Sequence, residues 1–303
     1  MNAVEKISDD RRASPQLVKT DPNLPALKVT GRDSLVISAG TSFAGRSFGE
    51  DTPVLLPRQG LIPGADYVVA ASGEPIALRL TRLPDDDSYI GGFHFAPGGN
   101  AEGRAGGDDV PAINPYSLWD RNFRPACVDP RGMALVHKPG GLFWCDIYLT
   151  GANCHVDGTS KFGVPIADGD ECPCDPDGDH YAQFDYATAA AVMAAHGKGL
   201  LNVEEFFAAA FGVTEKSAHK GDPRTTGLDA PRTSRFGLMQ ATGNLWVWGH
   251  DGDPDTPRAS VFGGSWFYGV DAGSRYAYVA CKWPEDSDGA LGARGRSDHL
   301  QPV

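Results

Sequence analysis

The sequence predicts an α+β protein in which a small all-β domain precedes a larger domain with little regular structure. Three observations lead to this class. Glycine (38) and proline (23) together make up about a fifth of the 303 residues, so turns are frequent and long helical bundles are disfavoured. Short apolar runs between turn residues dominate the first part of the chain. Only two segments carry helix signals.

The same patterns divide the chain into three parts. Residues 1–26 are polar and predict an N-terminal arm. Residues 27–84 predict the small β domain, a sandwich or a prism. An acidic turn near residue 84 marks the boundary to the larger domain, residues 85–303. The strands expected in the small domain lie at 35–37, 54–56, 67–70 and 76–80.

The larger domain combines two strand-like runs with two short helices. The strands are expected at 91–95 and 142–149. An alanine-rich helix is expected at 187–195, before a glycine. Asn202 and Glu205 have the spacing of a capping box, which predicts the start of the second helix.

The composition disfavours nucleic-acid and membrane partners. The net charge is −12 and the basic residues are not clustered, so the surface repels phosphate. No run reaches the roughly 18 apolar residues of a membrane span. The first residues contain no apolar signal core, so a leader is not expected. A cytoplasmic location and assembly into a virion both remain open.

Local catalytic signatures are absent from the sequence. It contains no nucleophile elbow, zinc-protease helix motif, P-loop or dinucleotide-binding glycine pattern. The six cysteines are interpreted as buried or incidental thiols, because without a leader a disulfide framework is not expected. No catalytic residue is therefore assigned.

One segment, residues 168–180, has the chemistry of a metal site. It contains carboxylates, two thiols and one imidazole within thirteen residues. Oxygen ligands suit Ca²⁺, and a Cys-x-Cys pair with histidine suits Zn²⁺. The spacing matches neither an EF-hand nor a zinc knuckle, so a solvated acidic loop is the competing interpretation. The candidate ligands are Asp168, Asp170, Cys172, Cys174, Asp177 and Asp179.

The most informative stretch is the C-terminal block from 235 to 300. It contains Gly-Asn-Leu-Trp-Val-Trp at 243–248 and Gly-Gly-Ser-Trp at 263–266. The glycine pair is expected to let backbone pass closely beneath a tryptophan. The tryptophans supply large buried area where regular structure is scarce. Arg275 and Arg294 can bond loop carbonyls or carboxylates through their planar forks.

Together these motifs resemble the C-type-lectin-like fold of the formylglycine-generating-enzyme type. More specifically, the chain is similar to the variable proteins of diversity-generating retroelements, on the order of its motifs and on the ending at 292–300. The resemblance covers most of residues 30–303. It implies that an error-prone copying step rewrites the codons of a C-terminal segment, about residues 260–297, while a fixed scaffold holds the loops.

The resemblance divides that segment into scaffold and variable positions. Substitution in the first two bases of an asparagine codon reaches every residue placed in the variable set, but not Lys282, Trp283 or Glu285. The scaffold residues are Gly263, Gly264, Trp266, Gly269, Gly273, Ser274, Arg275, Gly292, Arg294 and Gly295. The variable, ligand-binding residues are Ser265, Phe267, Tyr268, Asp271, Tyr276, Tyr278, Ala280, Cys281, Asp286, Asp288 and Ala290.

The resemblance implies a non-catalytic protein with a hypervariable ligand-binding face. Tyrosine-rich surfaces are typical of paratopes, and the aromatic residues at 267–278 are expected to be exposed rather than core. The expected partner is a protein or glycan receptor on a host or target cell, and the expected place a phage tail tip or a cell surface. Relatives of this kind include trimers, so a homo-oligomer built by the small β domain is expected.

Two other functions remain as alternatives. The first is a formylglycine-generating-type oxidase acting on a cysteine-containing protein, but only Cys281 lies in the C-terminal region. The second is a calcium-dependent sugar lectin, whose Glu-Pro-Asn-type triplets are missing. No cofactor is firmly expected beyond the candidate Ca²⁺ or Zn²⁺ at the acidic loop.

Overall fold

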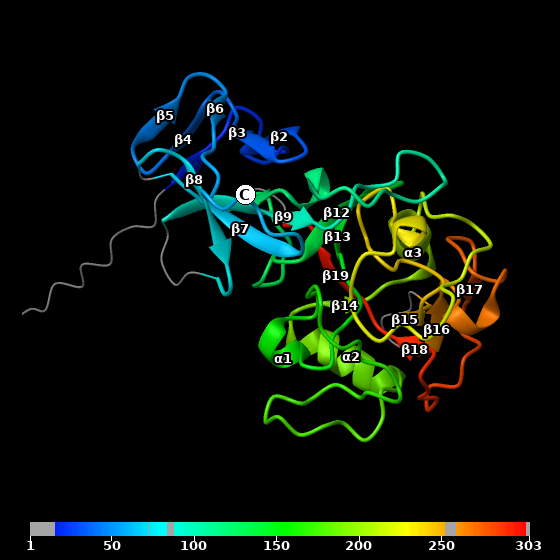
Figure 1. Cartoon of the computed structure of the whole chain (residues 1–303). Helices are drawn as coiled ribbons and strands as arrows, with labels where there is room; N and C mark the ends of the chain where they lie inside the picture. The colour runs from blue at the N-terminus through cyan, green and yellow to red at the C-terminus, as the bar shows by residue number, and fades with distance from the viewer. Residues whose placement is uncertain (1–15, 72, 84–87, 252–258, 301–303) are drawn as a thin grey trace, which may run out of the picture.

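The computed structural model describes residues 16–71, 73–83, 88–251 and 259–300. The fold is rich in β-sheet and has few helices (Figure 1). The N-terminal strands lie at one end of the molecule, and β15 to β18 lie at the other (Figure 1). No helix among the described residues is long and apolar enough to cross a membrane.

The N-terminal part contains two small antiparallel sheets. Their orders are β1-β4-β5 and β2-β3-β6. Alternate residues of a strand point to the same side, and Leu35 and Ile37 share the same buried core. The strands are β1 (Leu17–Val18), β2 (Leu27–Gly31), β3 (Ser34–Ile37), β4 (Thr41–Phe43), β5 (Arg46–Phe48) and β6 (Thr52–Pro53).

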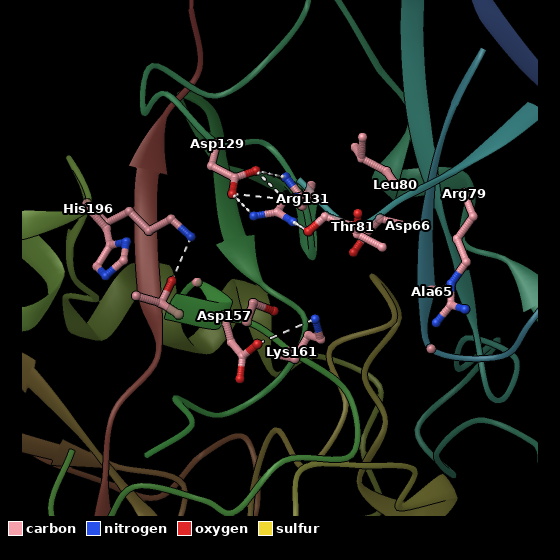
Figure 2. A pocket seen from close by; sticks show the side chains of 15 residues that line it. Ala65, Asp66, Arg79, Leu80, Thr81, Asp129, Arg131, Asp157, Lys161 and His196 are labelled. Atoms are coloured by element: carbon pink, nitrogen blue, oxygen red, sulfur yellow. Dashed lines mark hydrogen bonds and ion pairs between the residues drawn. The ribbon is translucent and has the colours of Figure 1, made fainter. Parts of the chain in front are cut away.

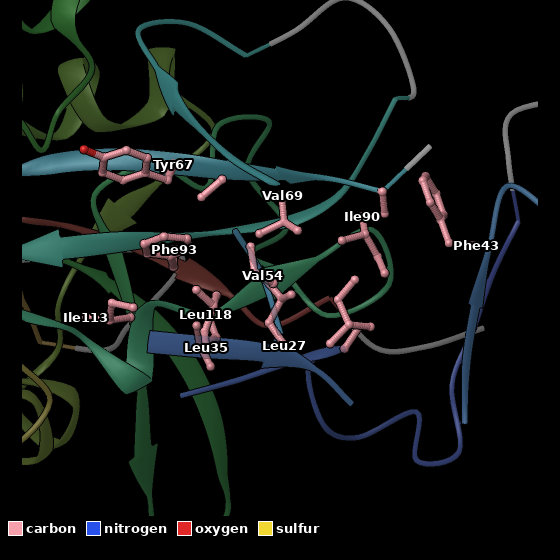
Figure 3. Packing of buried hydrophobic residues seen from close by; sticks show 14 of the residues in the cluster. Leu27, Leu35, Phe43, Val54, Tyr67, Val69, Ile90, Phe93, Ile113 and Leu118 are labelled. Carbon is pink, nitrogen blue, oxygen red and sulfur yellow. The ribbon is translucent and has the colours of Figure 1, made fainter. Parts of the chain in front are cut away.

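A five-stranded sheet connects this part to the rest of the chain. Its order is β10-β9-β7-β8, with β11 also paired to β9. Its apolar face packs on the N-terminal strands, and Leu27, Val69 and Phe93 share one core (Figure 3). The strands are β7 (Ala65–Ala70), β8 (Ile76–Leu80), β9 (Tyr89–Ala96), β10 (Ala112–Ile113) and β11 (Trp119–Asp120).

This sheet runs across the boundary expected at residue 84. Strands β7 and β9 pair over six positions, although they lie on opposite sides of that boundary. Residues 84–87 themselves lie outside the described residues. The parts 27–84 and 85–303 therefore share a core instead of packing separately.

Residues 16–26, expected to belong to a polar arm, are packed against the protein. Leu17 is buried, and Lys19 Nζ lies 2.8 Å from the Asp120 carboxylate in a buried ion pair. The same carboxylate accepts the backbone N–H of Ala26. The expectation of an arm is wrong for these residues because long-range contacts hold them, and residues 1–15 lie outside the described part.

The strand expected at 54–56 is reduced to a single bridge at Leu55.

The middle of the molecule is a four-stranded sheet of order β12-β13-β19-β14. Strand β19, close to the C-terminus, pairs with β13 on one side and β14 on the other. The last strand of the chain is therefore an interior strand of the central sheet. The strands are β12 (Met133–Lys138), β13 (Gly141–Asp146), β14 (Gly199–Leu200) and β19 (Gly295–Asp298).

The two helices expected from the sequence are present. Asn202 and Glu205 form the complete capping box at the start of α3, as predicted. In α2 the Asp185 side chain accepts the N–H of Thr188. The helices are α1 (Cys154–Asp157), α2 (Tyr186–Ala195) and α3 (Val203–Ala209), with 3₁₀ turns η1 (Pro115–Ser117) and η2 (Ala230–Arg232).

An interior strand of the central sheet, β13, carries a pH-sensitive contact. Trp144 Nε1 donates to His299 Nδ1 at 3.0 Å, which requires a neutral imidazole. Burial, and then the positive charge of Lys19, lower the pKa of His299 below its usual 6.5.

As the pH falls, the His299 imidazole of the unfolded chain therefore takes up a proton near pH 6.5, before that of the folded chain does. We expect the free energy of unfolding to fall as the pH drops below about 6.5, with a shallower slope in His299→Gln, measured by urea titration at each pH. Equal slopes would contradict this.

Candidate functional site

The candidate site is built on a four-stranded sheet near the C-terminus, of order β17-β16-β15-β18. Strands β15 and β18 are parallel, and the other pairs are antiparallel. Trp248 is fully buried and Trp246 nearly so, as expected for anchors of a loop-rich region. The elements are β15 (Trp246–His250), β16 (Ala259–Phe262), η3 (Trp266–Tyr268), β17 (Ala277–Tyr278) and β18 (Leu291–Gly292).

The glycine pair after β16 turns the chain into η3. Gly263 and Gly264 have φ of 94° and 78°, in the left-handed region that favours glycine. The Gly243 N–H donates to the carbonyls of both at 3.1 Å. A Cβ on Gly264 would meet the Asp271 carbonyl oxygen at 2.6 Å. The predicted close approach of backbone is confirmed, and the atoms nearest to a Cβ on Gly264 belong to Asp271 and Ala272.

Replacing Gly264 with alanine tests this close approach. The new Cβ is strained by the positive φ and also collides with fixed backbone. We expect the free energy of unfolding to drop by about 1–3 kcal/mol in chemical denaturation. Gly269→Ala is the matched control, because Gly269 also has a positive φ but open space around it. Equal losses in both variants would show that the collision contributes nothing.

A buried polar network that the sequence did not predict supports the glycine pair. Asn244 Nδ2 donates to Asp229 Oδ2 at 2.9 Å, and Arg232 forms an ion pair with the other oxygen of Asp229 at 2.8 Å. The Asn244 carbonyl accepts the N–H of Trp266 at 2.9 Å. The asparagine of the Gly-Asn-Leu-Trp motif therefore links η2 to η3. Asp229 and Arg232 belong to no sequence motif, so their part in this network could be identified only from the structure.

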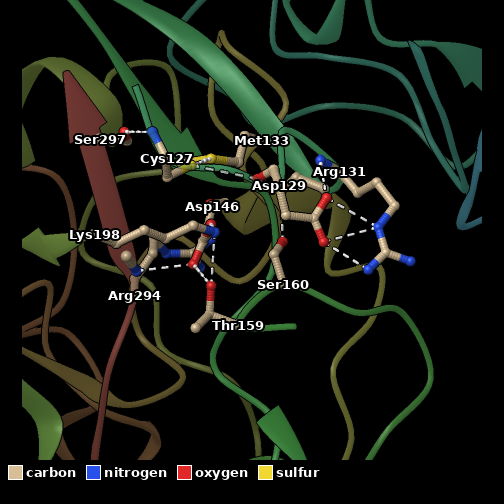
Figure 4. A network of polar contacts seen from close by, with 12 residues as sticks. Cys127, Asp129, Arg131, Met133, Asp146, Thr159, Ser160, Lys198, Arg294 and Ser297 are labelled. Carbon is tan, nitrogen blue, oxygen red and sulfur yellow. Dashed lines mark hydrogen bonds and ion pairs between the residues drawn. The ribbon is translucent and has the colours of Figure 1, made fainter. Parts of the chain in front are cut away.

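Arg294 joins this region to the central sheet (Figure 4). Its buried guanidinium donates to four backbone carbonyls: those of Asp146 and Ile147 at 2.7 Å, Met239 at 2.7 Å and Gln240 at 3.2 Å. Burial lowers its pKa below the usual value. The predicted fork on loop carbonyls is confirmed for Arg294.

Arg275 does not take the scaffold role predicted for it. Its side chain is exposed, and it makes no hydrogen bond or ion pair with the part of the chain that the structure describes. The reason is that the turn before it is closed by backbone contacts, since the Gly273 N–H donates to the Gly263 carbonyl at 3.0 Å. Ser274, predicted beside it, is buried and donates to the Glu215 carboxylate.

An exposed aromatic face covers the outer side of this sheet. We define it as Phe267, Tyr268, Val270, Tyr278 and Val279, each of which is between 41% and 74% exposed. The rings of Tyr268 and Tyr278 pack against Trp246, at centroid distances of 5.6 and 5.2 Å. The buried tryptophan therefore supports two tyrosines whose outer surfaces remain open to solvent, as the sequence predicted for the aromatic residues.

The remaining predicted variable residues differ in exposure. Ser265 is wrong as an outward position: it is fully buried, because its backbone pairs with Asn244 and turns the side chain inward. Trp283, excluded by the codon argument, is 74% exposed and was missed. The exposed positions are Asp271, Ala280, Cys281 and Asp288, and the half-buried ones are Tyr276, Asp286 and Ala290.

The acidic loop (168–180) does not gather its predicted metal ligands. Asp168 Oδ1 accepts the N–H groups of Asp170 and Glu171, both at 2.8 Å, and so orders a turn. The Cys174 thiol lies 3.8 Å from His180 Nε2. Within the described ranges, no group of three or more histidine, cysteine or carboxylate side chains is placed to hold a metal ion. The Asp175 carboxylate orders a second turn by accepting the N–H groups of residues 177 and 179. The predicted ligands Asp168, Asp170, Cys172, Cys174, Asp177 and Asp179 therefore do not converge in the described structure.

A charged pocket lies elsewhere, beside β7, β8 and α1 (Figure 2). Its volume is about 70 Å³. Arg131, Lys161 and Lys198 in its wall each pair with a carboxylate, so their charges are already balanced. This pocket does not compete with the aromatic face as a functional site.

Taken together, a loop-built C-terminal sheet with an exposed aromatic face defines a ligand-binding protein with a β-rich, lectin-like fold. No family model matches the chain. A tail fiber receptor-binding protein of Bordetella phage BPP-1 is 38% identical over 327 aligned positions, covering 93% of this chain and 84% of the relative. The chain belongs to this family of phage receptor-binding proteins.

Solved structures agree with this membership. The Major Tropism Determinant M1 and U1 variants are similar to the chain, each with a TM-score of 0.84, at 38% and 37% identity. Each match covers 94% of this chain and 86% of the other. The resemblance to retroelement variable proteins predicted from the sequence is thereby confirmed.

Proposed function

We propose that the chain is a non-catalytic receptor-binding protein of a phage tail, and that the aromatic face contacts a receptor on the host surface. The main observation behind this proposal is that Phe267, Tyr268 and Tyr278 of the face are exposed, although large apolar side chains are usually buried. Such rigid aromatic surfaces give contact area at low entropic cost. Family membership supports receptor binding, and neither the relative nor the solved structures favour the oxidase alternative.

The separation of scaffold and face supports diversification of the exposed positions. Gly264 and Arg294 are buried, and the Arg294 guanidinium donates to backbone carbonyls. Phe267 and Tyr278, by contrast, are exposed. Surface substitutions away from buried features change stability by only about 0.5 kcal/mol. Many side chains at these positions are therefore compatible with one fold, as a retroelement that rewrites the segment requires.

The finer assignments belong to the same proposal. The C-terminal part has the C-type-lectin-like form of an α+β domain, and the N-terminal strands act as an oligomerising region, with a trimer as the expected state. The receptor is a protein or glycan on a host cell, and many copies on one tail would raise weak single contacts to strong avidity. The proposal assigns no metal ion to the face.

The test is binding of the purified, labelled full chain to intact cells of the bacterium in which the phage grows. We expect saturable binding that weakens at least about 100-fold when Phe267, Tyr268 and Tyr278 are all replaced by serine, because aromatic anchors dominate interface energies. Val128→Ser and Val156→Ser, at exposed apolar positions away from the face, are the controls. Undiminished binding by a folded triple variant would overturn the proposal.

A further inference from the structure

The aromatic face continues into the loop 279–290, which carries Trp283, an exposed aromatic residue outside the predicted variable set. The loop 279–290 begins after Tyr278, whose ring packs on Trp246, and ends at Ala290, whose carbonyl accepts the Trp246 N–H at 2.9 Å. Both ends are thus beside the same buried tryptophan. Trp283, near the middle of the loop, is 74% exposed.

The acidic loop (168–180) and the residues that follow it are hydrogen-bonded to the loop 279–290. The Gly169 N–H donates to the Asp288 carbonyl at 3.0 Å, and the Asp170 carboxylate lies against Gly289. Further along, the N–H groups of residues 184 and 186 donate to the Ser287 hydroxyl at 2.9 Å and the Pro284 carbonyl at 3.1 Å. The fixed acidic loop is therefore a direct neighbour of the segment that carries Trp283.

Negative charge is concentrated in these two neighbouring segments. Residues 168–180 contain six carboxylates and no lysine or arginine, and residues 265–290 contain four carboxylates and two cations. The excess of eight is two thirds of the chain's net charge of −12. One of the two cations, Lys282, is paired with Asp286 at 2.7 Å. The side chains of Asp170, Glu171, Glu285 and Asp288 are exposed.

We infer that Trp283 and the exposed carboxylates of Asp170, Glu171 and Glu285, none of which belongs to the predicted variable set, form a fixed flank of the receptor-binding face, and that the flank selects a protein surface rich in lysine and arginine. The inference rests on the proposed function. Carboxylates around an apolar centre speed encounter with a basic surface and disfavour an acidic one. An exposed indole adds a cation–π partner for the same side chains. The variable residues then determine which of the basic protein surfaces is bound.

If the flank acts in this way, the protein prefers basic partners whichever residues occupy the variable positions. A phage-displayed library of the full chain is randomised at Phe267, Tyr268, Asp271, Tyr278 and Ala280. It is selected against hen lysozyme, a basic protein, and against lysozyme whose lysines are acetylated. We expect binders to the unmodified protein to be at least about tenfold more frequent, and to weaken as NaCl rises from about 0.05 to 0.5 M.

Two further backgrounds separate the flank from net charge. The first background removes the flank by four substitutions: Asp170→Asn, Glu171→Gln, Glu285→Gln and Trp283→Ser. We expect the preference for unmodified lysozyme to vanish in this background. In the second, three exposed acids of the N-terminal region are neutralised by Asp33→Asn, Glu50→Gln and Glu74→Gln, and we expect the bias to remain. Equal recovery on both probes, or an unchanged bias without the flank, overturns the inference alone. A starting library that yields no binder to either probe overturns the proposed function as well.

Discussion

Replacing Arg294 with methionine is expected to lower the free energy of unfolding by about 3–5 kcal/mol, among the largest effects of any single substitution in this protein. The guanidinium donates to the carbonyls of Asp146, Ile147, Met239 and Gln240, and methionine leaves all four without that donor. Urea denaturation followed by tryptophan fluorescence measures the loss.

Two variants make this result specific. Arg294→Lys is expected to lie between wild type and methionine, because one ammonium cannot reproduce a planar fork that serves two separate loops. Arg275→Met, at an exposed position, is expected to change stability by no more than about 0.5 kcal/mol. If both methionine variants lost the same stability, the bridging role of Arg294 would be refuted.

Replacing Asp146 with alanine is expected to cost about 3–5 kcal/mol as well, because it leaves a buried ammonium without its counter-charge. Lys198 Nζ lies 2.6 Å from Asp146 Oδ1, and both side chains are almost completely buried (Figure 4). Burial is the largest single influence and lowers the pKa of Lys198, but the combined effects of Asp146, Cys127 and Asp129 raise that pKa above its usual value. The other Asp146 oxygen accepts the Thr159 hydroxyl at 2.6 Å and the Gly295 N–H at 3.1 Å.

A double variant distinguishes loss of the pair from loss of packing. With Asp146→Leu and Lys198→Met together, no charge remains buried, so we expect much of the lost stability to return. The same urea titration gives the coupling free energy between the two positions. A double variant as unstable as the sum of the single ones would show that the unpaired charge is not the cause.

The parts of the fold that depend on neighbouring residues were predictable. The capping box of Asn202 and Glu205 and the alanine-rich helix α2 use contacts within one turn. The boundary at residue 84 failed because strand β9 pairs with β7 across it, and no local pattern encodes which strands pair. The attachment of residues 16–26 to the rest of the protein was missed for the same reason, because Lys19 is paired with the distant residue Asp120.

The candidate site shows the same division. The scaffold roles of Gly264 and Arg294 could be predicted because each residue lies in a recognisable motif and its chemistry suits one structural role, a close backbone approach for glycine and a bond to carbonyls for arginine. Arg275 and Ser265 were misplaced because alternation along a segment cannot distinguish inward from outward in irregular backbone. Trp283 was missed because a codon rule identifies what can vary, whereas exposure depends on the path of the loop.

The interior position of β19 has a consequence for how errors in the gene are filtered. Gly295 and Arg296 lie downstream of Ala290, the last predicted variable position, yet they pair with Leu200 and Cys145 in the middle of the molecule. Under the proposed diversification, a frameshift or a stop codon introduced before residue 295 deletes this strand and leaves the central sheet open. We expect such chains not to fold, so that only copies with an intact reading frame reach an assembled tail.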